Sequence, residues 1–290
     1  MAFLDYKIIE EIKYGWSNEK KYKVEKDNVF YFMRVNNLNK LDDLKQEYEM
    51  MCKVKEIGIS TNIEVEFGIY EDKVYSVWSW VDGELLENRI NDFSKEKQYE
   101  YGLIAGRYLK KIHSIEAKEN ITSYKEKFNT KLNKKIKSYN ECELKLKKEK
   151  LFLDYIDKNR SLIQDEKQVF HHGDYHIGNM MLDKNDNLVI IDYNRYDFGE
   201  PYAEFNRMIW NAKASKYFAS GLVDGYFENN IPLDFWKKLL LYLACNMISS
   251  LPWAIPFGEE EVEIMKKQED DILSWYDDFK SIIPSWYTKL

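Results

Sequence analysis

Residues 170–201, FHHGDYHIGNMMLDKNDNLVIIDYNRYDFGEP, constrain the fold more than any other stretch of the chain. Two short apolar runs, 180–182 and 188–192, flank the turn DKNDN and predict a β-hairpin. Asn179 stands immediately before the first run, and Asp192 ends the second. Because a hairpin brings the start of its first strand next to the end of its second, we expect Asn179 and Asp192 to lie side by side.

This pair has the chemistry of a magnesium site. An amide oxygen and a carboxylate are hard ligands that suit Mg²⁺ with phosphate groups better than zinc. Asp174 falls in a loop five residues before Asn179, where it can accept a proton from an incoming hydroxyl. Phosphoryl transfer requires this division of labour between a carboxylate for the nucleophile and oxygen ligands for the metal ions.

The histidines of the segment raise a competing hypothesis, a zinc hydrolase. His172 and His176 are four residues apart, a spacing that on a helix can bind zinc. Gly173 and Gly178 disfavour a helix here, and no cysteine or further histidine elsewhere in the sequence completes a zinc site. We therefore expect His172 to form hydrogen bonds within the loop, and His176 to lie near the phosphates or in the loop wall.

The combined pattern HGDxxxxN and IDxxxxxG resembles the aminoglycoside phosphotransferase and choline kinase group, which are relatives of protein kinases. The matching residues are His172-Gly173-Asp174, Asn179, Ile191-Asp192 and Gly199, while Gly199-Glu200-Pro201 with Glu204 resembles the GDPxxD pattern of the group. Weaker similarity extends over most of residues 10–210. The resemblance implies phosphorylation of a small-molecule hydroxyl by ATP or GTP, with Asp174 as catalytic base and Asn179 and Asp192 as Mg²⁺ ligands.

A second aspartate competes for the metal role, because the letters DFG occur at 197–199. In protein kinases the aspartate of this motif binds Mg²⁺. Asp197, however, lies 18 residues past Asn179 and beyond the hairpin, whereas Asp192 has the spacing of the resembled group. We assign the metal to Asp192 and interpret Asp197 as a loop or capping residue.

The order of predicted elements gives the fold class, α+β. Strands are expected at 6–13, 21–26 and 29–35, a helix at 41–57, and two further strands before Gly83. Helices then dominate, at about 94–115, 123–138, 143–158, 203–226, 234–250 and 259–280. With the resemblance, this predicts a two-lobed protein-kinase-like fold with a small antiparallel β-rich N-terminal lobe containing one helix, 1–82, and a large mainly helical C-terminal lobe, 83–290.

Within the N-terminal lobe, a kinase needs a strand cation for the phosphates, paired with a glutamate on the helix. Arg34 is the candidate cation in VFYFMRV, where the group commonly has lysine, although a surface arginine on an edge strand is the simpler interpretation. Glu47, eleven residues before Gly58, has the spacing of the helix glutamate; Glu49 is the alternative on another helix face.

The remaining nucleotide contacts are predicted from weaker signals. The loop over the phosphates would be residues 14–18, with Ser17 and Asn18 as candidates, although it matches neither GxGxxG nor the P-loop. Ser79-Trp80-Val81-Asp82-Gly83 resembles the interlobe hinge of the group. Backbone groups of Ser79 and Val81 would there meet the purine.

The acceptor is expected to be a cationic amino-sugar. Residues 259–278 carry nine acidic residues against two lysines, a pattern that also fits an ordinary solvated helix face. Glu204, Glu263 and Asp270 are the candidate contacts. Choline or another amino-alcohol would instead need an aromatic cage, for which Trp210, Trp253, Trp275 and Tyr276 are available. A nucleotide-binding homologue without catalysis is the remaining alternative, supported only by Arg34 in place of lysine.

Composition limits the setting. A net charge of −7 over 290 residues argues against general nucleic-acid binding. The charged N-terminus lacks a signal-peptide pattern, and the apolar run 239–255 is interrupted by polar residues and a proline, so we expect a buried helix and no membrane segment. Three cysteines without a CxxC pair indicate a reducing, cytoplasmic environment. The oligomeric state cannot be predicted.

Overall fold

The computed structural model describes residues 2–3, 5–13, 19–117 and 122–290, and it divides into two compact units. The first unit comprises Met1–Leu86 and Gly178–Asn194, and the second comprises Glu87–Ile177 and Arg195–Leu290. The hairpin at Gly178–Asn194 belongs to the first unit because β9 pairs with β7. The sequence-based boundary after residue 82 had placed this hairpin with the C-terminal part.

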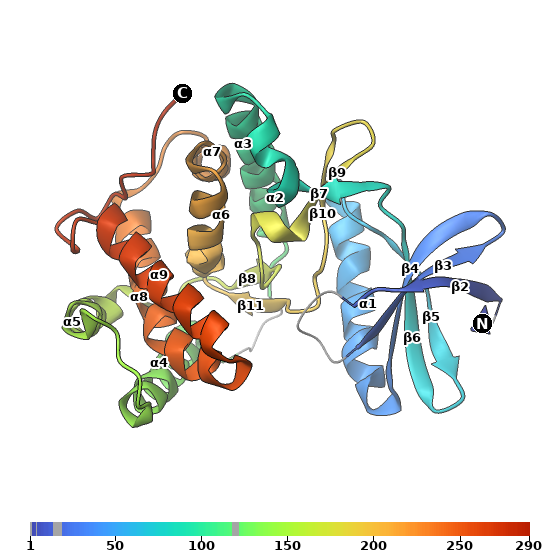
Figure 1. Ribbon diagram of the computed structural model, residues 1–290, viewed down its shortest axis with the longest axis horizontal. Helices are drawn as coiled ribbons and strands as arrows, with labels where there is room; N and C mark the ends of the chain where they lie inside the picture. The colour runs from blue at the N-terminus through green and yellow to red at the C-terminus, as the bar shows by residue number, and fades with distance from the viewer. Residues whose placement is uncertain (1, 4, 14–18, 118–121) are drawn as a thin grey trace. The chain divides into compact units, whose positions relative to one another are not determined.

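The first unit is built on a six-stranded antiparallel sheet with the order β1-β2-β3-β4-β6-β5, and one long helix, α1, lies along it (Figure 1). A second, three-stranded sheet has the order β10-β9-β7. The elements are β1 (Ala2–Phe3), β2 (Tyr6–Glu11), β3 (Lys20–Lys26), β4 (Val29–Asn37), η1 (Leu38–Lys40), α1 (Leu41–Glu56), β5 (Glu64–Tyr70), β6 (Lys73–Ser79), β7 (Gly83–Leu85), β9 (Met180–Asp183) and β10 (Leu188–Ile190).

Strand periodicity gives the two faces of the large sheet different roles. Met33 of β4 lies opposite Val77 of β6, and both are fully buried in an apolar cluster on one face. Arg34, the next residue, lies opposite Ser76 and therefore points to the other face, which carries α1. The alternation thus places Arg34 beside the helix that bears Glu47.

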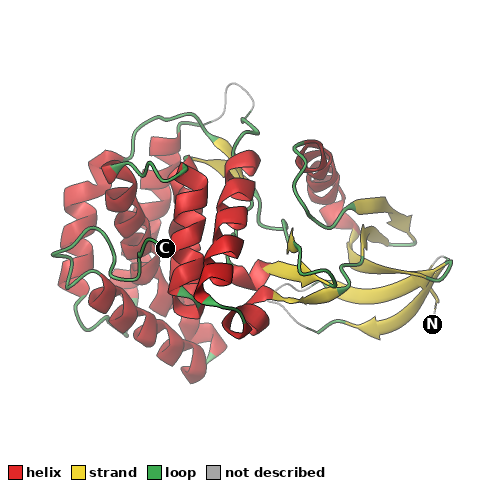
Figure 2. Cartoon of the chain, turned by 90° about the horizontal axis from the view of Figure 1, so that it is seen from above, coloured by secondary structure: helices red, strands yellow, loops and turns green. Residues whose placement is uncertain are grey.

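The second unit is mainly helical (Figure 2). Its elements are α2 (Leu86–Arg89), η2 (Ile90–Asp92), α3 (Lys95–Ile112), α4 (Tyr124–Glu141), α5 (Glu149–Asn159), η3 (Arg160–Leu162), β8 (Val169–His171), η4 (Ile177–Asn179), β11 (Asp197–Gly199), η5 (Pro201–Arg207), α6 (Met208–Ala214), α7 (Lys216–Phe227), α8 (Leu233–Ala254), η6 (Ile255–Phe257) and α9 (Glu259–Trp275), of which α2 and η4 straddle the boundary between the units. The single helix expected at 203–226 is divided into η5, α6 and α7. Between α6 and α7, Ser215 is extended and caps α7 by accepting a hydrogen bond from the Phe218 N–H.

Helix α8 forms the centre of this unit. By length and composition, the stretch Leu233–Phe257 is apolar enough to cross a membrane. However, 61% of its most apolar 18 residues, whose mean hydropathy is 1.4, is buried within the protein. The helix packs against α4, α5, α9 and η5. Its apolar surface is therefore used within the protein core, as the sequence predicts.

Helices α3 and α7 approach each other closely through glycines. Each helix carries two glycines four residues apart, Gly102 and Gly106 on α3 and Gly221 and Gly225 on α7. A Cβ atom built on Gly221 would lie 2.2 Å from the backbone oxygen of Tyr99, and one on Gly102 would lie 2.2 Å from that of Phe218. The two backbones can hold this distance only without side chains between them.

Gly221→Ala is expected to lower the free energy of unfolding by about 1–3 kcal/mol, because the added methyl group forces the two helices apart. Urea unfolding followed by circular dichroism would measure the loss. Arg107→Ala, on the exposed side of α3, is the control and should change stability by less than about 0.5 kcal/mol. Equal effects of the two substitutions would contradict the close-packing interpretation.

A second feature with consequences for stability is Glu64, at the start of β5. Its Oε2 atom is buried and accepts no hydrogen bond from the part of the chain that the structure describes. Burial, together with the nearby charge of Glu47, raises the pKa of Glu64 to about 8. Two residues on, Glu66 accepts hydrogen bonds from the hydroxyls of Tyr6 and Tyr75, which outweigh burial and lower its pKa.

Because the folded state holds the Glu64 proton more tightly than the unfolded chain does, its contribution to stability is complete below pH 4.5 and is lost as the pH rises toward 8. Glu64→Gln should therefore flatten the pH dependence of stability and be more stable than the parent at pH 8, by roughly 1–3 kcal/mol. Glu66→Gln should instead be less stable at that pH. Urea titrations at several pH values would test both, and parallel curves for the parent and Glu64→Gln would refute the raised pKa.

Candidate active site

The loop that carries Asp174 follows β8 in the second unit, and its backbone conformation requires a glycine at position 173. Gly173 has φ +86°, and a Cβ atom there would lie 1.9 Å from the backbone oxygen of Arg195. The Gly173 N–H donates to both carboxylate oxygens of Glu204, at 3.1 and 3.3 Å. Glu204 is only 2% exposed, so this buried carboxylate fixes the loop from beneath.

Two further hydrogen bonds hold the loop beyond Asp174. The Tyr175 hydroxyl donates to the backbone oxygen of Ala105 on α3 at 2.7 Å. The Ile177 N–H donates to Oδ1 of Asn211, a buried residue of α6, at 2.8 Å. The loop is thus attached to three helical elements of the second unit, and the position of Asp174 follows from their packing.

The Asp174 carboxylate lies beside two arginines and a histidine. Arg207 Nε is 2.8 Å from Oδ1, Arg195 Nη1 is 3.4 Å from Oδ2, and His176 Nε2 is 3.8 Å from Oδ1. Burial alone would raise the pKa of Asp174, but His176, Arg207 and Arg195 outweigh it and hold the pKa well below its usual range. Asp174 is therefore ionised at neutral pH, as a group that takes a proton from a hydroxyl must be. Neither arginine was predicted from the sequence to lie beside Asp174.

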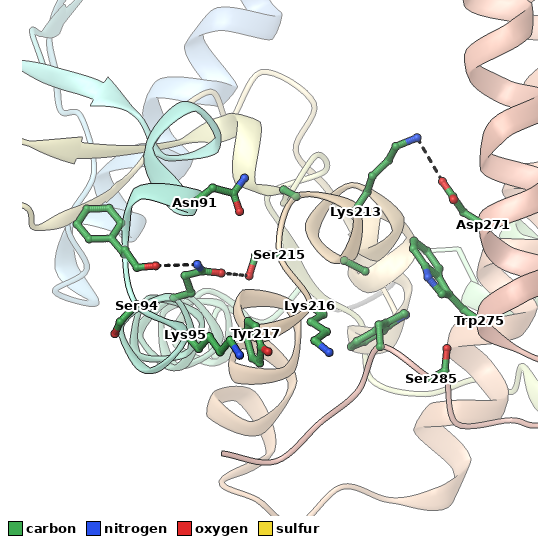
Figure 3. A pocket seen from close by; sticks show the side chains of 15 residues that line it. Asn91, Ser94, Lys95, Lys213, Ser215, Lys216, Tyr217, Asp271, Trp275 and Ser285 are labelled. Carbon is green, nitrogen blue, oxygen red and sulfur yellow. Dashed lines mark hydrogen bonds and ion pairs between the residues drawn. The ribbon is translucent and has the colours of Figure 1, made fainter.

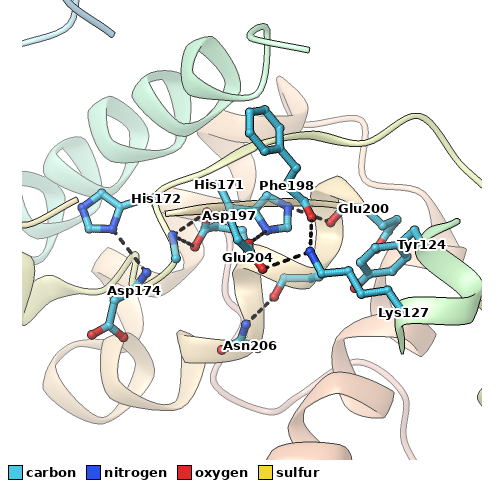
Figure 4. A network of polar contacts seen from close by, with 12 residues as sticks. Tyr124, Lys127, His171, His172, Asp174, Asp197, Phe198, Glu200, Glu204 and Asn206 are labelled. Atoms are coloured by element: carbon cyan, nitrogen blue, oxygen red, sulfur yellow. Dashed lines mark hydrogen bonds and ion pairs between the residues drawn. The ribbon is translucent and has the colours of Figure 1, made fainter. Parts of the chain in front are cut away.

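Asp197 lies in strand β11, not in a loop or helix cap as expected. It pairs across the strands with His171 of β8, and its Oδ1 lies 3.2 Å from His171 Nδ1 (Figure 4). His171 Nε2 donates to the Glu200 backbone oxygen at 3.0 Å, and although burial opposes ionisation, the neighbouring Asp197 raises the pKa of His171. Although burial opposes ionisation, this contact, with Lys127 and Lys131, lowers the pKa of Asp197 to about 2.

The other histidines of the region do not form a zinc site. No group of three or more His, Cys, Asp or Glu side chains with metal-binding geometry occurs among the described residues. His172 Nδ1 accepts a hydrogen bond from the Asp174 N–H at 3.3 Å, and His176 lies against the ring of Trp210. Burial lowers the pKa of His113, which lies beneath the loop near Glu204, to about 4, so it is neutral.

The predicted metal ligands lie on the hairpin of the first unit. Ile190 of β10 pairs with Met180 of β9, and the Ile191 N–H donates to the Asn179 backbone oxygen at 3.0 Å. Asn179 and Asp192 are therefore at the same end of the hairpin. Asp192 has φ +67°, a left-handed conformation that is uncommon for aspartate and that is often found at functional sites. One amide and one carboxylate oxygen, leaving the other positions to water and phosphate, fit Mg²⁺.

Arg34 is held by two carboxylates of the first unit. Its Nη1 donates to Glu47 Oε1 at 2.7 Å, while its Nε and Nη2 donate to the two oxygens of Glu19, each at 2.9 Å. The Arg34 side chain is only 7% exposed, so it is not a surface residue. Burial raises the pKa of Glu47, whereas for Glu19 the bidentate bond to Arg34 outweighs burial and lowers the pKa. Glu19, next to the predicted phosphate loop in sequence, was not anticipated.

The remaining predicted nucleotide contacts are less defined. Ser79 ends β6, and its N–H donates to the Ile63 backbone oxygen at 2.7 Å, so this amide is already used within the sheet. Val81 lies in the short stretch between β6 and β7 and is half-buried. Ser17 and Asn18 lie outside the described residues. All four remain predictions.

A cavity of about 240 Å³ lies in the second unit beside the catalytic loop. Gly173 and Arg195 line it together with Glu204, and α4 and α8 supply much of the remaining wall. The predicted acceptor contacts Glu263 and Asp270 do not line it. They are exposed on α9 and form ion pairs with Lys266 and Lys147, at 2.7 and 2.8 Å.

A wider, open hollow of about 860 Å³ occurs elsewhere in the same unit (Figure 3). Trp275, a candidate for the aromatic cage, lines it, but none of the predicted catalytic, metal or nucleotide residues does. Several of its polar side chains are paired with one another, as in the Ser215–Gln98 hydrogen bond and the Lys213–Asp271 ion pair. The smaller cavity is therefore the one next to the Asp174 loop, although Gly173 and not Asp174 lines it.

Solved structures with a similar fold include a thermostable mutant of aminoglycoside phosphotransferase APH(4)-Ia in ternary complex with ADP and hygromycin B (12% identity, TM-score 0.65, covering 92% of this chain and 94% of that one). A gentamicin complex of APH(2")-IIa (15%, 0.63, 90% and 91%) and an aminoglycoside-3'-phosphotransferase of type VIII (17%, 0.56, 84% and 93%) are also similar. These likenesses show a protein-kinase-like fold with an antiparallel N-terminal sheet and a helical C-terminal part.

No curated protein matches the chain significantly. The model of the phosphotransferase enzyme family, APH, however, matches residues 8–236, which is more than half of the chain. This match includes the catalytic loop, the hairpin and the Arg34–Glu47 pair. The chain therefore belongs to the APH phosphotransferase family.

Proposed function

We propose that this protein transfers the γ-phosphoryl group of ATP or GTP to a hydroxyl of a small molecule. The observation that carries the proposal is the fixed loop of Asp174, whose carboxylate is kept ionised by Arg207 and Arg195 and whose backbone is tied to Glu204. A positioned carboxylate of this kind is what phosphoryl transfer to an alcohol requires of the protein.

Asp174 orients the acceptor hydroxyl and takes its proton. Because the transition state of phosphoryl transfer is loose, the proton moves late, when the hydroxyl has become acidic through bonding to phosphorus. A carboxylate with a low pKa can therefore serve, since orientation contributes more than basicity. Arg207 and Arg195 keep the carboxylate from turning away and from binding a proton of its own.

The first unit supplies the nucleotide contacts. Asn179 and Asp192 would hold Mg²⁺, which, when bound, neutralises charge on the nucleotide phosphates. Arg34, fixed by Glu47 and Glu19, would direct its remaining N–H groups to the phosphates. Backbone groups of Ser79 and Val81, and the loop residues Ser17 and Asn18, complete the proposed nucleotide site.

The acceptor is proposed only as a small hydroxyl compound at this stage. A cationic amino-sugar, bound through Glu204, Glu263 and Asp270, remains the prediction from sequence, and hygromycin B and gentamicin are named for two of the similar structures. A coupled assay of ADP or GDP release with Mg²⁺ and a panel of cationic, neutral and anionic hydroxyl compounds tests the proposal. Acceptor-stimulated turnover supports it, and nucleotide binding without stimulation by any acceptor would favour a non-catalytic homologue.

Asp174→Asn should reduce turnover by about 10²–10⁴-fold, the range typical of general acid–base groups, while nucleotide affinity stays the same. The amide can still accept a hydrogen bond but cannot take the proton. Steady-state kinetics with the acceptor found in the panel would measure the loss. A reduction of less than about tenfold would show that Asp174 is not the catalytic base.

Asp192→Asn and Asp197→Asn form a matched pair that distinguishes the two candidate metal aspartates. Asparagine tolerates the left-handed backbone of Asp192, so this change removes charge with little added strain. We expect Asp192→Asn to weaken Mg²⁺-dependent nucleotide binding by about tenfold or more, and Asp197→Asn to leave it intact. Calorimetric titration of AMP-PNP with and without Mg²⁺ would measure both, and the reverse pattern would identify Asp197 as the ligand.

A further inference from the structure

The cavity beside the catalytic loop is lined by more positive than negative side chains. Its cationic side chains are Lys127, Lys131, Lys135 and Arg195, and its acidic side chains are Asp197 and Glu204. Glu204 is only 2% exposed, and its carboxylate accepts a hydrogen bond from the Gly173 N–H. Asp197 lies close to Lys127, Lys131 and His171.

The lysines form one stripe on α4. Lys127, Lys131 and Lys135 are spaced four residues apart and therefore share a helix face. Like charges at this spacing destabilise a helix. Lys127 and Lys131 are partly compensated by Asp197, at 3.3 and 3.7 Å, which leaves Lys135 as the uncompensated member of the stripe.

Lys135 contacts only neutral oxygens among the described residues. Its ammonium donates to Asn246 Oδ1 at 2.9 Å and to the Cys245 backbone oxygen at 3.4 Å, and no described carboxylate lies within ion-pair distance. Burial, with the nearby charges of Arg207 and Lys131, lowers the pKa of Lys135. A half-buried ammonium that faces a cavity without a counter-ion is the arrangement that an anionic ligand completes.

We infer that the acceptor carries an anionic group, a carboxylate or a phosphate, which binds in this cavity between Lys135, Lys131 and Arg195. The inference rests on the proposed function and specifies its substrate class. Arg195 connects the cavity to the proposed base, because it lines the cavity and lies 3.4 Å from Asp174, which does not itself line it. The cavity, at about 240 Å³, is below the roughly 300–1,000 Å³ of drug-sized sites and suits an acceptor of about monosaccharide size.

The neutral part of the wall fits such an acceptor. Asn206 and Asn246 line the cavity with Tyr124 and Tyr242, and the two amides are the neutral polar groups that can bind sugar hydroxyls. The acid-rich helix α9, which suggested a cationic acceptor, lines no part of it. The charge of the cavity therefore favours a hydroxyl compound with an acidic substituent over an aminoglycoside.

Binding of inorganic phosphate tests the anion site without any catalysis. Calorimetric titrations would be made with saturating AMP-PNP and Mg²⁺, so that phosphate cannot occupy the nucleotide site, and at constant ionic strength. We expect Lys135→Gln to weaken phosphate binding by about tenfold, and Lys134→Gln, an exposed neighbour on α4, to bind like the parent. Equal affinity of Lys135→Gln and the parent, or no phosphate binding at all, would overturn the inference.

The acceptor panel gives a second readout, with D-glucose, D-glucosamine, D-glucuronate and D-glucose 6-phosphate as probes that share one ring. Preferential turnover of glucuronate or of the sugar phosphate, with a KM raised about tenfold in Lys135→Gln and kcat retained, supports the inference and tells a carboxylate from a phosphate ligand. Preference for glucosamine, or a Lys135→Gln effect on the nucleotide KM instead, overturns it. If the protein neither binds nor turns over nucleotide, the proposed function is refuted instead. Titration with phosphate in the absence of nucleotide then shows whether the anion site exists.

Discussion

The buried carboxylate of Glu204 is the constraint on which the catalytic loop depends. A fully buried acid must be hydrogen-bonded, and the Gly173 N–H is the group that reaches it. That contact requires a positive φ at Gly173 and brings its backbone against Arg195. Asp174, the next residue, is then set between Arg195 and Arg207. The position of the Asp174 carboxylate, the proposed base, thus depends on a buried residue beneath the loop.

The second unit contains two charge-rich stretches that stand out in the sequence, an acidic one on α9 and a basic one on α4. The acids of 259–278 are numerous, but on α9 they form surface ion pairs such as Glu263–Lys266 and Asp270–Lys147. Exposed pairs of this kind contribute little to stability and leave little field for a ligand. The lysines of α4 are fewer, yet one of them, Lys135, is half-buried against α8 with no carboxylate of the described residues in ion-pair distance. Burial, rather than the count of charges, decides which group can select a substrate.

Local signals predicted most of the fold and half of the site. The resemblance to the kinase group suggested the pair Arg34 and Glu47, with a surface Arg34 and Glu49 as alternatives, and the structure joins Arg34 to Glu47 at 2.7 Å. The hairpin likewise predicted the pairing of Asn179 and Asp192. Arg207 could not be found in this way, since it reaches Asp174 through the packing of η5 under the loop. Its only signal is its position three residues after Glu204.

Arginine in place of the usual strand lysine changes what the first unit must provide. An ammonium is satisfied by one carboxylate and a phosphate, whereas a buried guanidinium has five N–H groups in a planar fork. Glu47 and Glu19 together occupy three of them and fix the plane of the fork. One N–H on each terminal nitrogen is left, and these can meet two phosphate oxygens. Glu19 is therefore the compensation that makes Arg34 usable, and replacing Arg34 by lysine alone would leave one buried carboxylate without its partner.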